Sequence, residues 1–131
     1  MTNITTDDFF TGLFAALVFN GKKGLSIRNE RFDRSLVPVF QKLQELAPSK
    51  GLDIQFRIRL HPFHGDSITV RTAIYSAAQH GLISLDNPEY QDIQFKIDKE
   101  QANQILGNVP GGKDLFLELA ADWKDLDKVA V

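Results

Sequence analysis

The sequence Asp-Ile-Gln-Phe-Arg-Ile, at residues 53–58, returns as Asp-Ile-Gln-Phe-Lys-Ile at residues 92–97. Apolar and polar side chains alternate in both copies, which is typical of a β-strand with one buried face. Between the copies, residues 67 to about 80 carry apolar side chains at helical spacing. We therefore expect two half-buried strands side by side, with this helix packed across one face of their sheet.

The length and composition favour one folded domain. The chain has 131 residues, of which 43% are apolar and 24% charged, close to ordinary globular usage. A chain of this size buries roughly two-thirds of the surface that its unfolded form exposes, so it needs no metal or disulfide to fold. The absence of cysteine excludes disulfides, thiol nucleophiles and cysteine metal sites. We expect a single domain over residues 1–131.

Neither the first residues nor the longest apolar run near them predicts contact with a membrane. Residues 1–8 carry two acids and no basic side chain, unlike a signal peptide. The apolar run at residues 13–19 is seven residues long, whereas a membrane span needs about 20. We expect a cytoplasmic protein that works without a membrane.

The net charge of −2 is unevenly distributed along the chain. Residues 1–85 hold ten Lys and Arg against seven Asp and Glu, whereas residues 86–131 hold five against ten. The acidic second part disfavours general affinity for phosphate backbones, while the first part is compatible with a local basic patch.

The first helix is predicted to begin after a cap at Thr5 or Thr6 and to run to about Phe19. Its apolar side chains run almost all the way round. Such a helix either lies at the centre of the core or is partly covered by a second copy of the chain. Because a domain of this size can surround few helices completely, Phe9 and Phe10 are candidate contacts between two copies.

The remaining elements complete the predicted fold class. A second helix is expected from Leu36 to Ala47 behind a Ser35 cap, with Pro38 in its first turn; the alternative is a kinked helix from about Asn29. A hairpin is predicted over residues 82–97, and further helices at residues 99–106 and 113–126. The expected class is α+β: a small, mostly antiparallel sheet of about three strands, with four or five helices packed mainly on one face.

The most reactive-looking cluster is a turn-rich segment that contains His61, His64 and Asp66. Two imidazoles and a carboxylate within six residues suit a site for zinc or another divalent ion, and histidine transfers protons near neutral pH. The same residues also fit a plain turn in which Asp66 caps the following helix. A metal-assisted enzyme is therefore one alternative, and we expect no cofactor.

Residues 67–83 combine a helix cap, a Thr-Val-Arg step, an alanine-rich apolar side and a Gly-Leu-Ile entry into a hairpin. This pattern, which extends over about 30 residues with the hairpin, resembles the recognition helix and wing of winged-helix repressors. The resemblance implies DNA binding through the outward side chains, which are Arg71, Thr72, Tyr75, Ser76 and Gln79. Two features disfavour it: a predicted strand stands where the preceding helix belongs, and the wing carries Asp86, Glu89 and Asp92.

No motif in the chain predicts a complete catalytic set. The leading hypothesis is therefore a non-catalytic interaction or regulatory module that associates with itself or with a protein partner. The expected interaction surface contains Arg57 and Arg59 on the polar side of the first strand, Arg71 and Tyr75 on the central helix, and the two phenylalanines of the first helix. Winged-helix DNA binding is the first alternative, and the metal-assisted enzyme is the second.

Overall fold

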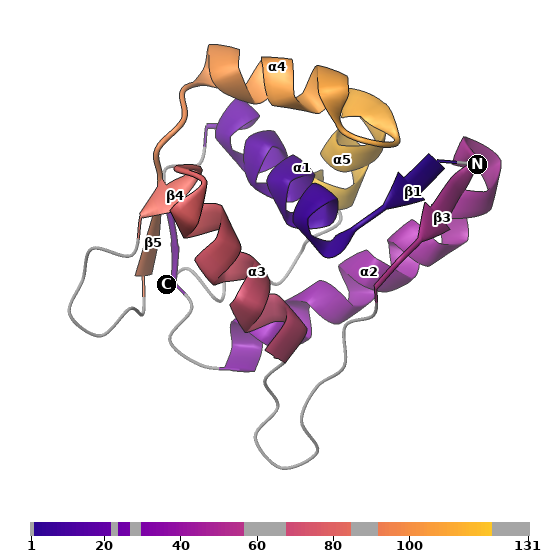
Figure 1. Cartoon of the computed structure of the whole chain (residues 1–131), viewed down its shortest axis with the longest axis horizontal. Helices are drawn as coiled ribbons and strands as arrows, with labels where there is room; N and C mark the ends of the chain where they lie inside the picture. Colours follow the sequence, from indigo (N-terminus) through magenta and orange to yellow (C-terminus); the bar gives the residue numbers. More distant parts are fainter. Residues whose placement is uncertain (1, 22–23, 27–29, 57–67, 85–91, 122–131) are drawn as a thin grey trace.

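The computed structural model describes residues 2–21, 24–26, 30–56, 68–84 and 92–121. Helices predominate over two small sheets in this part of the chain (Figure 1). In chain order the elements are β1 (Thr2–Ile4), α1 (Thr6–Phe19), β2 (Gly24–Ser26), α2 (Glu30–Lys50), β3 (Leu52–Ile54), α3 (Ile68–Gln79), β4 (Ile83–Ser84), β5 (Asp92–Phe95), α4 (Lys99–Asn108) and α5 (Gly112–Ala121). The predicted mixed α+β class is confirmed in this helix-dominated form.

The central element is α1, which lies between the two sheets with α3, α4 and α5 packed around it (Figure 1). A capping box begins the helix: the Thr5 hydroxyl accepts a hydrogen bond from the Asp8 N–H at 3.2 Å, and the Asp8 carboxylate accepts one from the Thr5 N–H at 3.0 Å. From Phe9 to Val18 every residue except Thr11 is buried. The apolar side chains all round this helix are therefore explained by its position at the centre of the core.

This burial corrects the expectation that Phe9 and Phe10 face a second copy of the chain. The two side chains are 0% and 1% exposed. The ring of Phe9 packs against those of Phe10, Phe40 and Phe56, at centroid distances of 5.3, 6.4 and 5.2 Å. Because residues of the same chain already surround them, they belong to the interior and offer no surface to a partner.

The contact between α1 and α5 depends on a glycine. A Cβ atom built on Gly12 would lie 2.5 Å from the ring of Phe116, which is fully buried. Real Cβ atoms essentially never come this close to another atom, so a larger residue at Gly12 requires the ring or the helix to move. The two helices can approach this closely only with glycine at this position.

The two Asp-Ile-Gln-Phe segments do not pair with each other, which corrects the predicted architecture. β3 pairs in parallel with β1, with Thr2 opposite Leu52 and Ile4 opposite Ile54. β5 is the middle strand of a separate antiparallel sheet in the order β2-β5-β4. Both segments still bury alternate side chains, since alternation defines the face that is buried and does not define the neighbouring strand.

Each segment brings an aromatic ring to α1. Phe56, just after β3, lies 5.2 Å from Phe9, and Phe95 of β5 lies 5.6 Å from Phe14. The two sheets therefore cover different parts of one helix (Figure 1). Gln55, just after β3, and Gln94 of β5 are both exposed, and β3 and β5 belong to different sheets.

α2 is longer than the preferred prediction. It begins at Glu30 and ends at Lys50, so both Pro38 and Pro48 lie inside it. The predicted start behind a Ser35 cap is wrong, and the alternative start near Asn29 is close to the observed one. Pro38 is exposed, so the carbonyl group that loses its helical partner to the proline ring can be hydrated on that side.

The C-terminal helices close the core over α1. α4 begins with a capping box between Asp98 and Gln101, and it ends two residues later than predicted, at Asn108. α5 covers Gly112–Ala121, and the rest of the predicted helix to residue 126 lies outside the described residues. Lys99 and Lys113 place their ammonium groups 5.1 and 4.0 Å from the ring centroid of Phe19, a cation–π contact that joins α1, α4 and α5.

Candidate functional site

α3 has one buried side and one side that faces solvent. Its buried residues, at helical spacing, are Val70, Ala73, Ile74 and Ala77. The helical spacing in the sequence predicts these four together with Ala78, and the small alanines allow α3 to lie close to α1. Ala78 is partly buried and also packs against the core, so the stripe extends to this residue.

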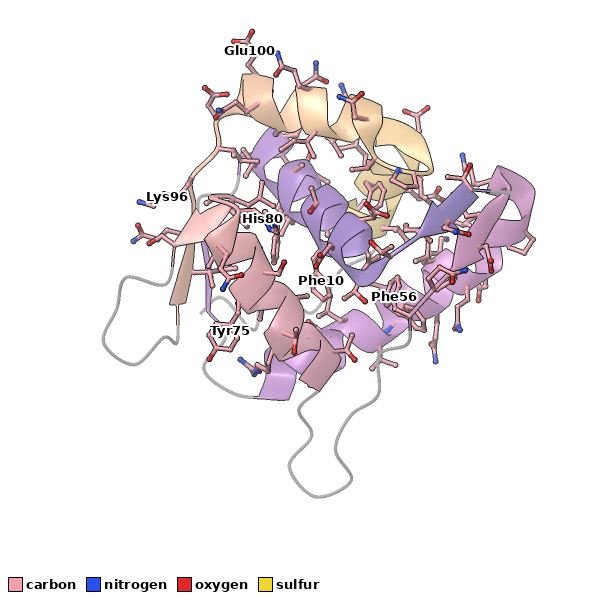
Figure 2. The ribbon with its side chains drawn as sticks, viewed as in Figure 1. Phe10, Phe56, Tyr75, His80, Lys96 and Glu100 are labelled. Carbon is pink, nitrogen blue, oxygen red and sulfur yellow. The ribbon has the colours of Figure 1, made fainter. Side chains whose placement is uncertain are left out.

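The solvent-facing side of α3 presents Thr72, Tyr75 and Gln79, all exposed. Tyr75 is 57% exposed, and it is the large apolar side chain that stands out at the surface of the described residues. Figure 2 shows it pointing away from the body of the protein. Arg71 is half exposed beside it. Tyr75 thus points outward as the helical spacing predicts, whereas Ser76, which was predicted on the same side, is half-buried and lines a cleft against α1.

The end of α3 leads directly into the antiparallel sheet. Gly81 has a φ of 78°, a left-handed conformation that suits glycine. The Leu82 N–H donates to the Ala77 carbonyl at 3.1 Å, and the Gly81 N–H donates to the Ala78 carbonyl at 3.2 Å, the pair of bonds that defines a Schellman motif. β4 starts at Ile83, and it pairs with β5. The sharp helix end thus fixes the hairpin next to α3.

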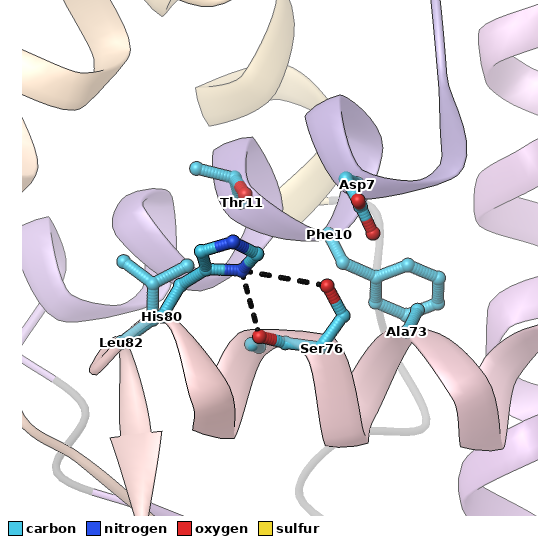
Figure 3. Close-up of a pocket in the computed structure, with 8 residues that line it drawn as sticks. Asp7, Phe10, Thr11, Ala73, Ser76, His80 and Leu82 are labelled. Atoms are coloured by element: carbon cyan, nitrogen blue, oxygen red, sulfur yellow. Dashed lines mark hydrogen bonds between the residues drawn. The ribbon is translucent and has the colours of Figure 1, made fainter.

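A small cleft of about 40 Å³ lies at the surface between α3 and α1, with room for about one water molecule (Figure 3). Asp7, Ser76 and His80 line it together with Thr11. His80 Nδ1 lies 2.8 Å from the Ser76 carbonyl oxygen and 3.4 Å from the Ser76 hydroxyl. Because a carbonyl oxygen only accepts hydrogen bonds, Nδ1 carries the proton and donates it there.

This arrangement does not suit nucleophilic catalysis by Ser76. A general base must take the proton of the hydroxyl group through a free ring nitrogen. His80 Nδ1 is the nitrogen next to that hydroxyl, and it carries the proton that it donates to the Ser76 carbonyl. It therefore has no lone pair with which to accept the hydroxyl proton. The imidazole instead gives the Ser76 carbonyl a second hydrogen bond, since that carbonyl also accepts from the His80 backbone N–H at 3.0 Å.

A second cleft, of about 260 Å³, lies between Asp7 and the first two turns of α3. Asp7 and Thr6 at the start of α1 line it together with Thr69, Thr72 and Ala73 of α3. Asp7 is exposed, so its negative charge contributes to the field at this end of α3. Sequence reasoning missed this residue, because no local pattern links Asp7 to a helix some 60 positions later.

The other predicted site residues lie elsewhere. Arg57 and Arg59, and the metal or catalytic candidates His61, His64 and Asp66, are outside the described residues. Among the described residues, no group of three or more His, Asp or Glu side chains is placed to hold a metal ion. Of the predicted interaction residues, Arg71 and Tyr75 are the two that the structure describes outside the core, and both belong to α3.

Comparisons with known proteins add no assignment. No protein-family model, no curated protein and no solved structure matches this chain. Within the described ranges, none of the helices has both the length and the apolar character required to cross a bilayer.

Proposed function

We propose that this chain is a DNA-binding regulatory domain of the winged-helix type, with α3 as its recognition helix. The observation that carries the proposal is the outer face of α3. Thr72, Tyr75 and Gln79 are exposed there, and the helix leads directly into the β4–β5 hairpin. An α-helix fits the major groove, where exposed polar side chains reach the edges of the bases.

Charge supports the choice of this helix. Among the helices in the described part of the chain, α3 is the one that contains no Asp or Glu, and its charged residue is Arg71. The four other helices all carry carboxylates. A polyanion that approaches α3 therefore meets a helix with a net positive charge.

The order of the elements supports the same proposal. With β3 set aside, α1 to β5 follow one another as helix, strand, helix, helix, strand, strand, and β5 lies between β2 and β4. The antiparallel β4–β5 pair that follows α3 is the hairpin wing that the resemblance to winged-helix repressors implies. β3 lies between α2 and α3 in the chain, where a simple helix-turn-helix has a short turn.

The competing hypotheses have less support. Self-association rested on Phe9 and Phe10, which are buried. The metal-assisted enzyme rests on residues 61–66, which lie outside the described part of the chain. A non-catalytic regulatory role is retained, with duplex DNA as the partner.

Fluorescence anisotropy with a short labelled duplex of mixed sequence, at low salt, tests the proposal. We expect binding that Tyr75→Ala weakens about 5- to 30-fold, a loss of about 1–2 kcal/mol, because the side chain leaves the contact face. Arg71→Ala weakens it and reduces the salt dependence, since a cation next to phosphate is lost. Gln44→Ala, at an exposed position on α2, is the matched control and leaves binding unchanged.

Asp7→Asn gives a test with the opposite sign. Removing a carboxylate beside the first turns of α3 lowers the repulsion of phosphate, so we expect binding to strengthen by about twofold to fivefold at low salt. Absence of duplex binding by the original chain, or affinities that are identical for all these variants, would sink the proposal.

A further inference from the structure

We infer that α3 reads a short A·T-containing step of duplex DNA, with Gln79 contacting an adenine in the major groove; this rests on the proposed DNA-binding function. Thr72, Tyr75 and Gln79 are all exposed. Their separation of seven positions corresponds to about two helical turns, so the three side chains share one face. That face extends roughly 10 Å along the helix axis, which matches about three base pairs.

The chemistry of these side chains selects the base. A carboxamide such as that of Gln79 both donates and accepts, and it fits the N6 and N7 atoms of adenine with two hydrogen bonds. A threonine methyl group, as in Thr72, packs against the methyl group of thymine. The tyrosine hydroxyl suits a phosphate oxygen, which positions the helix. None of the three residues is Arg or Lys, the side chains that most often contact guanine.

The amide of Gln79 is not held by another residue among those described, unlike the amides of Gln55 and Gln101. Gln55 donates from Nε2 to Asp53 at 2.6 Å, and Gln101 accepts at Oε1 from the Asp98 N–H at 2.9 Å. The Nε2 donor and the Oε1 acceptor of Gln79 can therefore bond to a base edge without breaking a bond within the protein.

Selection from a library of random duplexes, carried out in parallel with the original chain and with Gln79→Arg, tests the inference. We expect the original chain to enrich a motif that contains an A·T pair. Gln79→Arg should change that single position to G·C, because the guanidinium group pairs with O6 and N7 of guanine. At this position the preference for A·T over G·C should become a preference of about tenfold for G·C. Gln44→Arg, a matched control on an exposed position of α2, keeps the original motif.

The possible failures are distinguishable. If the original chain binds duplexes but Gln79→Arg enriches the same motif as the original chain, the readout by Gln79 is wrong and the proposed function stands. If the original chain binds no duplex, both fall. Circular dichroism of Gln79→Arg checks that the variant is folded, which we expect of a change at an exposed position.

Discussion

α1 and α3 are neighbouring helices of 14 and 12 residues with opposite surroundings. α1 is covered almost completely, from Phe9 to Val18, whereas α3 buries one stripe and leaves Thr72, Tyr75 and Gln79 in solvent. The difference separates two roles. A change in α1 alters packing and therefore stability, while a change on the outer face of α3 alters mainly what the helix presents to a partner.

The largest effect that this comparison predicts is the loss of an α1 ring. Phe14 is fully buried between Phe10 and Phe95, at 5.8 and 5.6 Å, so Phe14→Ala should lower the free energy of unfolding by about 3–5 kcal/mol. Tyr75→Ala on α3 should change it by less than about 0.5 kcal/mol. Urea unfolding followed by circular dichroism measures the free energy of unfolding of both variants. Equal losses of stability would show that α1 and α3 do not differ in their contribution to the core.

A smaller effect is expected at the glycine where α1 meets α5. Gly12→Ala forces a Cβ against the ring of Phe116, which should cost about 1–3 kcal/mol despite the better helix propensity of alanine. Gly107→Ala in α4 meets no atom within 4 Å and should instead stabilise by roughly 0.5–1 kcal/mol. Thermal unfolding of the two variants shows whether each substitution raises or lowers stability. Stabilisation by both would contradict the close approach of Gly12 to Phe116.

The smallest predicted effect lies at the start of α1. Thr5→Ala removes the side chain that accepts from the Asp8 N–H, and should cost about 1 kcal/mol, whereas Thr5→Ser should keep most of the cap. Thr72→Ala, on the outer face of α3, should be neutral or slightly stabilising. Hydrogen exchange of the Asp8 amide reports the cap directly; unchanged protection in Thr5→Ala would argue that packing alone holds this end of the helix.

Local features of the fold could be predicted from the sequence. The start of α1 at its cap, the buried stripe of α3 and the stop at Gly81 all followed from short patterns whose causes lie within one or two helical turns. The outward position of Tyr75 followed from the same helical period. These predictions needed no knowledge of distant residues.

The partners of the strands could not be predicted in the same way. Alternation at residues 52–56 and 93–97 correctly indicated the buried side chains, but it contains no information about which strand lies alongside. β1 has only three residues, too few for a recognisable pattern, so the parallel partner of β3 was missed. The position of Asp7 beside α3 was missed for a similar reason, because tertiary packing alone brings them together.

The central position of α1 has a consequence for synthesis on the ribosome. α1 is completed about 80 residues before α4 and α5, the helices that cover much of it. At roughly 5–20 residues per second, its apolar surface waits on the order of 5–15 s for that cover. Nascent chains that stop before residue 99 should therefore be the ones that chaperones retain and that aggregate when released.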